Sequence, residues 1–191
     1  MVSKKQELQD KKKKKKWVQI LAPKEFNNVE VGETYIEEPI NSVGKTLTVN
    51  LMVLTRDPKK QSNNITFKVT EFKNNALQTE ILNLNMQTAQ LKRTTRKDKT
   101  KIEDSFVVVT KDNIKLKFKP ILLTKAIAHK SILTALRKST REVVSKVGKE
   151  STFSQFIKDI VSGQTQKIIK NENKKVYPLA SCTIKRIERL N

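Results

Sequence analysis

Apolar and polar residues alternate over several short stretches in the first two thirds of the chain. This is the pattern of strands that bury one face. The alternating stretches are 47–53, 65–69, 77–86, 102–110 and 114–123. Ile81 and Leu82 interrupt the third of them. Asparagine-rich segments separate the stretches and are typical of tight turns, so we expect a meander of antiparallel strands.

The pattern changes to a helical period in the last third. Apolar residues recur every three or four positions over 132–147, and Gly148 is placed to end this helix. Thr152 and Gln155 form a capping box for a second helix, which a short third helix follows. Alternation returns over 181–190. We expect this last segment to be a strand that pairs with the earlier sheet.

These elements together predict an α+β fold. We expect an antiparallel twisted sheet or a partly closed β-barrel, packed with two to three C-terminal helices and a closing strand. A chain of 191 residues is long enough for one domain. The expected organisation is a disordered basic arm over 1–16 and a single domain over 17–191. That domain is mainly β up to residue 124, helical over 125–175 and closed by a strand over 180–190.

Charge is distributed very unevenly along the chain, whose formal net charge is +21. Residues 17–86 hold 7 basic and 8 acidic side chains. In contrast, eight lysines lie in 1–16, and 87–101 holds six basic residues and one acid, over a predicted short helix and a basic loop. The arm is an interaction tail or, alternatively, a solvated one. The excess predicts a surface for a polyanion, and nucleic acid is the favoured partner.

Several other kinds of function find no support in the residues. No apolar run is long enough to cross a membrane, and the N-terminus has no signal-peptide core, so we expect a protein that is neither membrane-bound nor secreted. Cys182 and His129 are each alone, and no glycine-rich phosphate loop occurs. The acids of 30–38 are better explained as solvated residues than as a Mg²⁺ site. We therefore expect no enzyme, metal, cofactor or small-molecule substrate.

As the nucleic-acid partner, RNA is better supported by the residues than DNA bound in a sequence-specific way. No DNA-binding motif occurs, aromatic residues make up only 5% of the chain, and contacts from Lys and Arg to phosphates are the mechanism that the residues permit. The candidate RNA-binding residues are Lys11, Lys12, Lys13, Lys14, Lys15, Lys16, Lys92, Arg93, Arg96, Lys97, Lys99, Lys101, Lys119, Lys125, Lys130, Arg137, Lys138, Arg141, Lys185 and Arg186.

Two alternatives remain open from the residues alone. A free single-strand-binding chaperone or regulator would use exposed aromatic rings, for which Phe67, Phe72, Phe106 and Phe118 are candidates, although their alternation favours a buried position. Trp17 is better explained as part of the first strand than as a stacking residue. An anionic membrane is suggested by the lysine-rich arm alone.

Four segments carry a resemblance to a known family. They are WVQILAPKEFNNVEVGET (17–34), LTVNLMVLTRD (47–57), KIEDSFVVVTKDNIKLKFKPILLTK (101–125) and YPLASCTIKRI (177–187). In this order they resemble the archaeal form of the S3Ae, or S1e, family of archaeal and eukaryotic small-subunit ribosomal proteins. Asn113 departs from this family, which usually has glycine there. So does TEILNLNMQTAQLKR, which replaces a stretch that commonly carries a Gly-His pair.

This resemblance implies a structural, non-enzymatic protein of mixed α/β fold in the cytoplasm. It implies a place on the platform of the small subunit, bound to ribosomal RNA near the rRNA 3′ end and the messenger RNA exit. The implied partners are small-subunit rRNA and neighbouring ribosomal proteins, and direct contact with messenger RNA is left open.

Overall fold

The computed structural model describes residues 15–95 and 97–190, which form two compact units. Unit 1 comprises residues 15–47 and 68–80, and unit 2 comprises residues 48–67 and 81–190. Each unit is described by itself below. The predicted arm lies outside the described residues except for Lys15 and Lys16.

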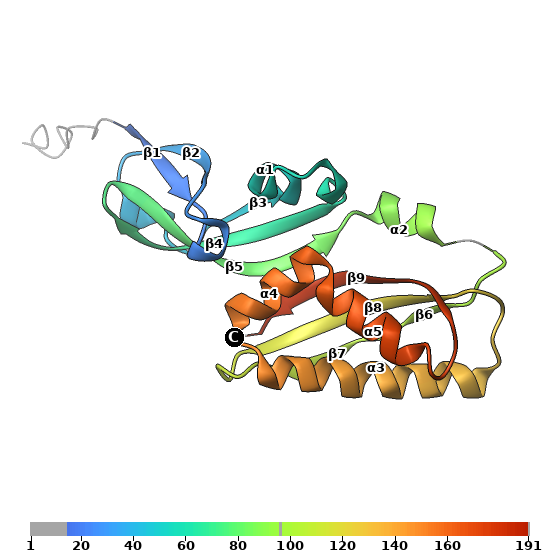
Figure 1. Cartoon of the computed structure of the whole chain (residues 1–191). Coiled ribbons are helices and arrows are strands. Elements are labelled where there is room, and N and C mark those ends of the chain that lie inside the picture. Colours follow the sequence, from blue (N-terminus) through green and yellow to red (C-terminus); the bar gives the residue numbers. More distant parts are fainter. Residues whose placement is uncertain (1–14, 96, 191) are drawn as a thin grey trace, which may run out of the picture. The chain divides into compact units, whose positions relative to one another are not determined.

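Nine strands of the described chain form one mixed sheet. The strands are β1 (Lys16–Leu21), β2 (Glu30–Ile36), β3 (Thr46–Asn50), β4 (Asn63–Lys73), β5 (Ala76–Met86), β6 (Lys101–Glu103), β7 (Phe106–Val109), β8 (Lys115–Thr124) and β9 (Leu179–Arg189). Their order is β2-β1-β5-β9-β8-β6, with β3 paired to β4, β4 to β5, and β7 to β8 (Figure 1). The sheet is open, so the twisted-sheet alternative of the α+β prediction holds and the barrel does not.

The described part of the chain also contains five α-helices and three short 3₁₀ turns. They are α1 (Leu51–Thr55), α2 (Thr88–Thr94), α3 (Lys130–Glu150), α4 (Phe153–Ser162), α5 (Gln164–Asn173), η2 (Lys24–Phe26), η3 (Pro39–Ser42) and η4 (Pro58–Lys60). The three C-terminal helices and the closing strand β9 confirm the prediction for the last third of the chain. Thr152 caps α4 by accepting a hydrogen bond from the backbone N–H of Gln155, which is one half of the predicted capping box. The Gln155 side chain does not return to Thr152 and donates to Asp159 instead.

Unit 1 is built around the hairpin of β1 and β2, which pair antiparallel. β1 also pairs with the first part of β5, where Ile20 lies opposite Leu77, and this pair is parallel rather than antiparallel as expected. Val18, Ile20, Val69 and Leu77 form a small buried cluster. The parallel pair arises because the chain passes through β2, β3 and β4 before β5 returns beside β1.

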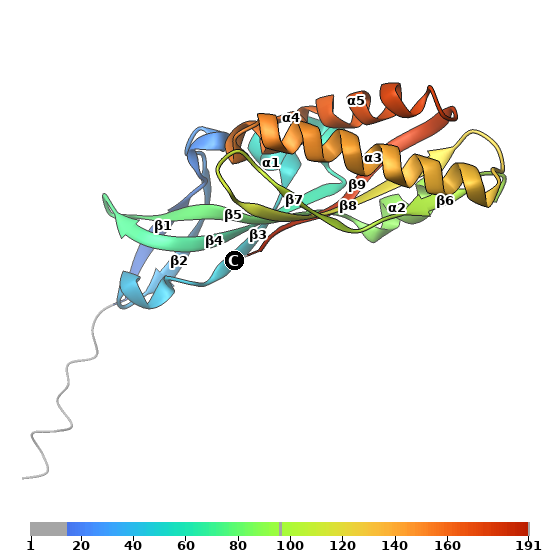
Figure 2. The same cartoon turned by 90° about the horizontal axis from the view of Figure 1, so that it is seen from below.

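The sheet of unit 2 is centred on β8, which pairs antiparallel with β9 along nearly its whole length. β6 and β7 both pair with β8 on its other edge. Figure 2 shows α3, α4 and α5 together along this part of the sheet. Phe118 is fully buried, with its ring 5.6 Å from that of Phe106 and 6.3 Å from that of Phe156. These rings fasten the helices to the sheet.

The predicted strand over 47–53 is wrong in its second half, because a helix begins at Leu51. The Asn50 side chain accepts a hydrogen bond from the backbone N–H of Met52 and so caps the start of α1. Leu51 and Leu54 are buried three positions apart, whereas Val53 is exposed. Burial therefore follows a helical period here, and the alternation of the sequence was misleading.

The close approach of α3 to β7 explains Gly148, which was expected to end the helix. The helix continues to Glu150, and Gly148 is buried inside it. A Cβ atom at this position would overlap the side chain of Val108 on β7. Glycine thus permits the contact between helix and strand rather than the end of the helix.

Asparagines form the tight turns of the sheet, as predicted. Asn74 and Asn75 join β4 to β5 with φ values of 52° and 60°. Asn113 joins β7 to β8 with a φ of 58°. Asparagine tolerates this left-handed region better than most residues, which explains how these turns form without glycine.

Candidate nucleic-acid interface

Three basic segments of unit 2 are fastened together around Thr124, a fully buried residue at the end of β8. The Thr124 hydroxyl accepts a hydrogen bond from the backbone N–H of Thr100 at 3.0 Å. The Thr100 hydroxyl in turn accepts one from the N–H of Ala128 at 3.1 Å. The N–H of Lys125 donates to the carbonyl of Pro178 at 3.2 Å. The loops that precede β6, α3 and β9 therefore meet at one end of unit 2.

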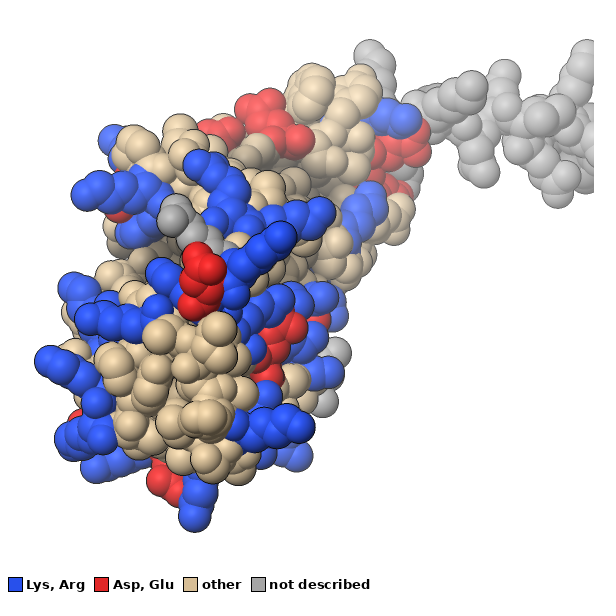
Figure 3. All heavy atoms as spheres, turned by 90° about the vertical axis from the view of Figure 1, so that its right-hand side faces the viewer, with Lys and Arg blue, Asp and Glu red and all other residues tan. Residues whose placement is uncertain are grey.

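These loops and the helix ends beside them carry many cations. Figure 3 faces this end of unit 2 and shows Lys and Arg side chains crowded on it, with few Asp or Glu. The exposed basic residues on these segments include Lys92, Arg93, Lys97, Lys125, Lys130, Lys170, Lys174 and Lys175. Of these residues, Lys175 is paired with Glu172 at 2.8 Å, and the surface keeps a large excess of cations that attracts a polyanion. We call this surface the basic end.

Three lysines of the basic end, Lys170, Lys174 and Lys175, were missed by the sequence analysis. A cavity of about 280 Å³ is lined by Lys125, Lys170 and Lys174 together with residues 178–180. The Lys170 ammonium donates a hydrogen bond to the carbonyl of Ala180 at 3.1 Å, which holds it at the rim. The density of lysines over 167–175 was a usable signal, but only the fold shows that they reach Lys125.

Five of the predicted RNA-binding residues are engaged with acids of their own chain. Lys101 and Lys185 lie 2.8 and 3.7 Å from the Glu103 carboxylate. Lys119 lies 3.8 Å from Glu188, which Arg186 also contacts. The fifth is Arg141. The first four lie on the strands β6, β8 and β9, Arg141 lies on α3, and together with their acids they form a mixed-charge surface.

Arg141 makes the best-defined of these ion pairs. Its Nε and one terminal nitrogen both donate to the Asp104 carboxylate at 2.7 Å, and the guanidinium lies over the Phe106 ring at 5.9 Å. The hydrogen bond from Arg141 holds the pKa of Asp104 below its ordinary value of 3.8, with smaller help from the Ser105 N–H and the charge of Arg137. The pair connects α3 to the segment between β6 and β7, so Arg141 has a structural role.

Six predicted residues remain exposed and make no ion pair within 15–95 and 97–190. They are Lys92, Arg93, Lys97, Lys125, Lys130 and Lys138. Lys99 and Arg137 are half-buried, and Lys15 and Lys16 are exposed at the start of β1 in unit 1. Lys11, Lys12, Lys13, Lys14 and Arg96 lie outside the described residues. We call the six exposed residues the unpaired set.

The aromatic rings do not form a stacking surface. Phe67 and Phe118 are fully buried, and Phe72 and Phe106 are half-buried. Trp17 is 67% exposed and its ring lies 5.1 Å from that of Tyr35. Trp17 is thus part of the first strand, as expected, although its ring faces outward. Among the described residues, the four candidate phenylalanine rings are therefore buried or half-buried, and none is exposed as a single-strand binder that stacks bases along a sheet would need.

Over residues 15–95 and 97–190, the chain has neither a metal-binding cluster nor a membrane-spanning helix. Within the described ranges, no group of three or more His, Cys, Asp or Glu side chains is placed to hold a metal ion. No described helix is long and apolar enough to span a membrane. Burial raises the pKa of the Cys182 thiol to about 12, so this side chain is a poor nucleophile.

Comparison with known proteins decides the family. Residues 3–191 match the Ribosomal S3Ae family. The chain belongs to that family. The small ribosomal subunit protein eS1 of Halorubrum lacusprofundi is 31% identical over 176 residues, which cover 92% of this chain and 82% of that protein. The eS1 protein of Saccharolobus islandicus is 31% identical over 183 residues, 96% of this chain and 88% of its own. The eS1 protein of Nanoarchaeum equitans is 31% identical over 166 residues, which cover 87% of this chain and 84% of that protein.

Membership in the S3Ae family confirms the resemblance that the four segments carried. It also confirms the prediction that the chain is a structural ribosomal protein rather than an enzyme. The matched range includes both units and every element described above, so the family relation covers the basic end as well as the hairpin of unit 1.

Proposed function

We propose that this S3Ae-family chain is a structural protein of the small ribosomal subunit and binds rRNA chiefly through the basic end and the unpaired set. The observation that carries the proposal is the cluster of mostly unpaired cations at the basic end, where Thr100 and Thr124 hold the loops together, in a chain of this family. Related proteins of similar length are named as small-subunit proteins.

The physical basis is neutralisation of phosphates. Each Lys or Arg that contacts a phosphate displaces counterions, so affinity falls steeply with salt. If about ten phosphates are contacted, the slope of log affinity against log salt is roughly −7 to −9. The ion-paired residues, such as Arg141 and Lys101, contribute less because their charge is already compensated by Asp104 and Glu103.

The proposal also covers the location of the chain and the roles of its N-terminal arm and of unit 1. The chain acts in the cytoplasm, on the platform of the subunit near the rRNA 3′ end and the messenger RNA exit. Residues 1–16 form a basic arm that becomes ordered on rRNA, ahead of one ribosomal domain over 17–191. Unit 1, where Trp17 and Tyr35 are exposed, contacts neighbouring ribosomal proteins.

Sedimentation tests the proposal directly. A tagged full-length chain is expressed in cells, and the extract is separated on sucrose gradients at low and high salt. We expect the chain to migrate with small subunits and to remain there as salt is raised, because a protein integrated among rRNA helices makes many contacts at once. A variant with glutamine at all positions of the unpaired set is expected to dissociate at lower salt.

A free pool at the top of the gradient, with no chain in the subunit fractions, would contradict the proposal. That result would favour the alternative of a free single-strand nucleic-acid-binding chaperone or regulator. A chain that stays with subunits equally well in the variant would retain the ribosomal role but remove the unpaired set from it.

A further inference from the structure

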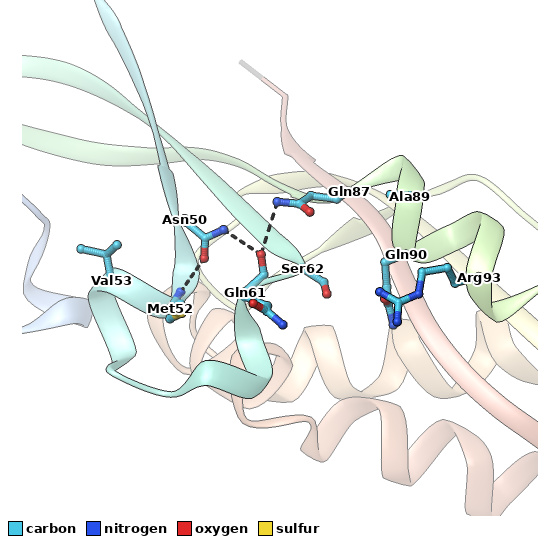
Figure 4. Close-up of a pocket in the computed structure, with 9 residues that line it drawn as sticks. All are labelled: Asn50, Met52, Val53, Gln61, Ser62, Gln87, Ala89, Gln90 and Arg93. Atoms are coloured by element: carbon cyan, nitrogen blue, oxygen red, sulfur yellow. Dashed lines mark hydrogen bonds between the residues drawn. The ribbon is translucent and has the colours of Figure 1, made fainter.

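A polar cavity of about 490 Å³ lies in unit 2, away from the basic end's lysine cavity (Figure 4). It lies among the end of β3, helix α1, the turn before β4 and the start of α2. Four of its lining residues carry side-chain amides, namely Asn50, Gln61, Gln87 and Gln90, and Arg93 lines it from α2. No acidic residue lines it. Its size is within the range of small-ligand sites.

The floor of the cavity is held by hydrogen bonds. The Asn50 amide donates to the backbone carbonyl of Gln61 at 2.7 Å and accepts from the N–H of Met52 at 2.9 Å. The side-chain amide of Gln87 donates to the same Gln61 carbonyl at 3.3 Å. The backbone N–H of Gln87 donates to the carbonyl of Ser62 at 2.8 Å. Two amides are thus used to join α1, the turn and the start of α2, and the cavity exists before any ligand arrives.

Other polar groups of the cavity are left available. Within 15–95 and 97–190, the side-chain amides of Gln61 and Gln90 and the guanidinium of Arg93 have no hydrogen-bond or ion-pair partner. Gln90 and Arg93 lie one turn apart on α2, so both can face one ligand. Met52 and Val53 add an apolar rim, and they are 41% and 55% exposed, respectively.

We propose that this cavity binds one unpaired nucleotide of single-stranded RNA, an inference that rests on the proposed RNA-binding function and extends it to a base-reading site. An amide offers a donor and an acceptor side by side, which matches the edge of a base and adenine best. Gln61 and Gln90 therefore bind the base edge. Arg93 binds the phosphate, and Met52 and Val53 cover a base face.

A single-stranded ligand fits this chemistry better than a duplex or a peptide. RNA sequence is read mainly where bases are unstacked and splayed out, and a paired base would hide the edge that the amides need. A peptide could also hydrogen-bond to amides. However, a cationic residue with no lining acid favours a ligand that carries negative charge, as each nucleotide does.

The test compares two RNA probes on the full-length purified chain. The probes are an oligoadenylate of about 12 nucleotides and a duplex of equal charge. The variant Gln61→Met with Gln90→Met removes both amides without changing charge or length. The control Gln164→Met changes an exposed glutamine of α5 outside the cavity. We expect the double variant to lose about tenfold in affinity for oligoadenylate at an unchanged salt slope, with duplex binding and the control unaffected.

The outcomes separate the two proposals. Equal oligoadenylate affinity in the wild type and the double variant, with a steep salt slope kept by both, would overturn the nucleotide site and leave the rRNA function in place. No salt-dependent RNA binding by the wild type would count against the proposed function itself. A photo-crosslinking residue at Val53 gives a second readout in assembled subunits. A crosslink to RNA supports the site, and a crosslink to a protein overturns it.

Discussion

The two units of this chain are both built on strands with one buried face, yet they differ sharply in charge. From Trp17 onward, unit 1 holds four basic and seven acidic residues, whereas unit 2 holds 28 basic and ten acidic residues. The strands β4 and β5 run through both units, and all of their charged residues, Lys68, Glu71, Lys73 and Glu80, lie in unit 1. The cationic excess of unit 2 therefore lies outside these two shared strands, in its loops, its helices and its other strands.

The cores of the two units differ as well. The cluster in unit 1 has four buried residues, of which Leu77 is fully buried. Unit 2 encloses a larger core between the sheet and three helices, with Phe118 at a contact between β8 and α4. We therefore expect unit 2 to be the more stable support, which suits a surface that must hold many like charges together.

The largest expected effect comes from the cores. Phe118→Ala should lower the free energy of unfolding by about 3 to 5 kcal/mol, because it removes a buried ring and leaves a cavity. Leu77→Ala in unit 1 should cost about 2 to 4 kcal/mol. Hydrogen exchange read by mass spectrometry locates each loss. We expect Phe118→Ala to expose the amides of β8, β9 and α4, and Leu77→Ala to expose those of β1 and β2.

Hydrogen exchange of the two variants can also show that the two units do not differ in stability. If either substitution removes protection equally from both units, the chain unfolds as one cooperative body and the two cores have no separate stability. If Leu77→Ala leaves unit 2 fully protected, the basic surface has a support of its own.

The next effect concerns RNA affinity and uses two matched sets of four lysines. Changing Lys92, Lys97, Lys125 and Lys130 of unit 2 to glutamine should make the log–log salt slope about 3 units less steep and weaken binding by roughly 10² to 10³ near 0.1 M salt. The reason is the loss of up to four phosphate contacts. Filter binding to small-subunit rRNA over a range of salt measures both quantities.

The control set lies in unit 1 and comprises Lys24, Lys45, Lys68 and Lys73, all exposed, of which Lys73 is paired with Glu71 at 2.7 Å. Both sets remove the same charge from the chain, so a long-range effect of net charge is equal in the two. We expect the control to change the slope by less than about 1 unit. Equal losses from both sets would mean that the difference in charge between the units does not locate the RNA surface.

Local pattern predicted the C-terminal helices of unit 2, but it failed at one segment of unit 2 and at one strand pair of unit 1. The helical period over 132–147 and the capping box at Thr152 predicted α3 and α4 because the signals are contained within each element. The alternation at 47–53 failed because the cap formed by Asn50 and the burial of Leu54 decide the local structure. The parallel pair of β1 and β5 depends on residues more than fifty positions apart, which no local pattern reveals.

The candidate interface, like the fold, could be predicted from the sequence only in part. Net charge per segment predicted Lys92, Lys125 and Lys130 as phosphate-facing, a role that remains a prediction. It could not show that Arg141 is bound to Asp104, because the two residues are 37 positions apart. Nor could it bring Lys170 to Lys125. A count of charges finds the excess, but ion pairing determines which charges are available.

A smaller effect on RNA binding distinguishes two neighbouring cations of α3, both of which the sequence analysis predicted to bind RNA. Lys138 is exposed and unpaired among the described residues, whereas Arg141 is held by Asp104. Lys138→Gln should make the salt slope for rRNA less steep by about 0.7 to 0.9, the value of one phosphate contact. Arg141→Gln should change it by less than half as much. A larger change from Arg141→Gln would show that RNA displaces Asp104 from the guanidinium.

The smallest effect is the pH dependence of the pair between Asp104 and Arg141. The hydrogen bond from Arg141 lowers the pKa of Asp104 in the folded chain below 3.8, so folding favours the carboxylate. The stabilisation is therefore fully present above the unfolded pKa and is lost as pH falls through the lower folded pKa. Urea unfolding should show Asp104→Asn to be less stable than the wild type at pH 7, with the difference shrinking below about pH 4. A difference that is constant from pH 7 to pH 2 would mean that packing, and not the charge of Asp104, joins α3 to the β6–β7 segment.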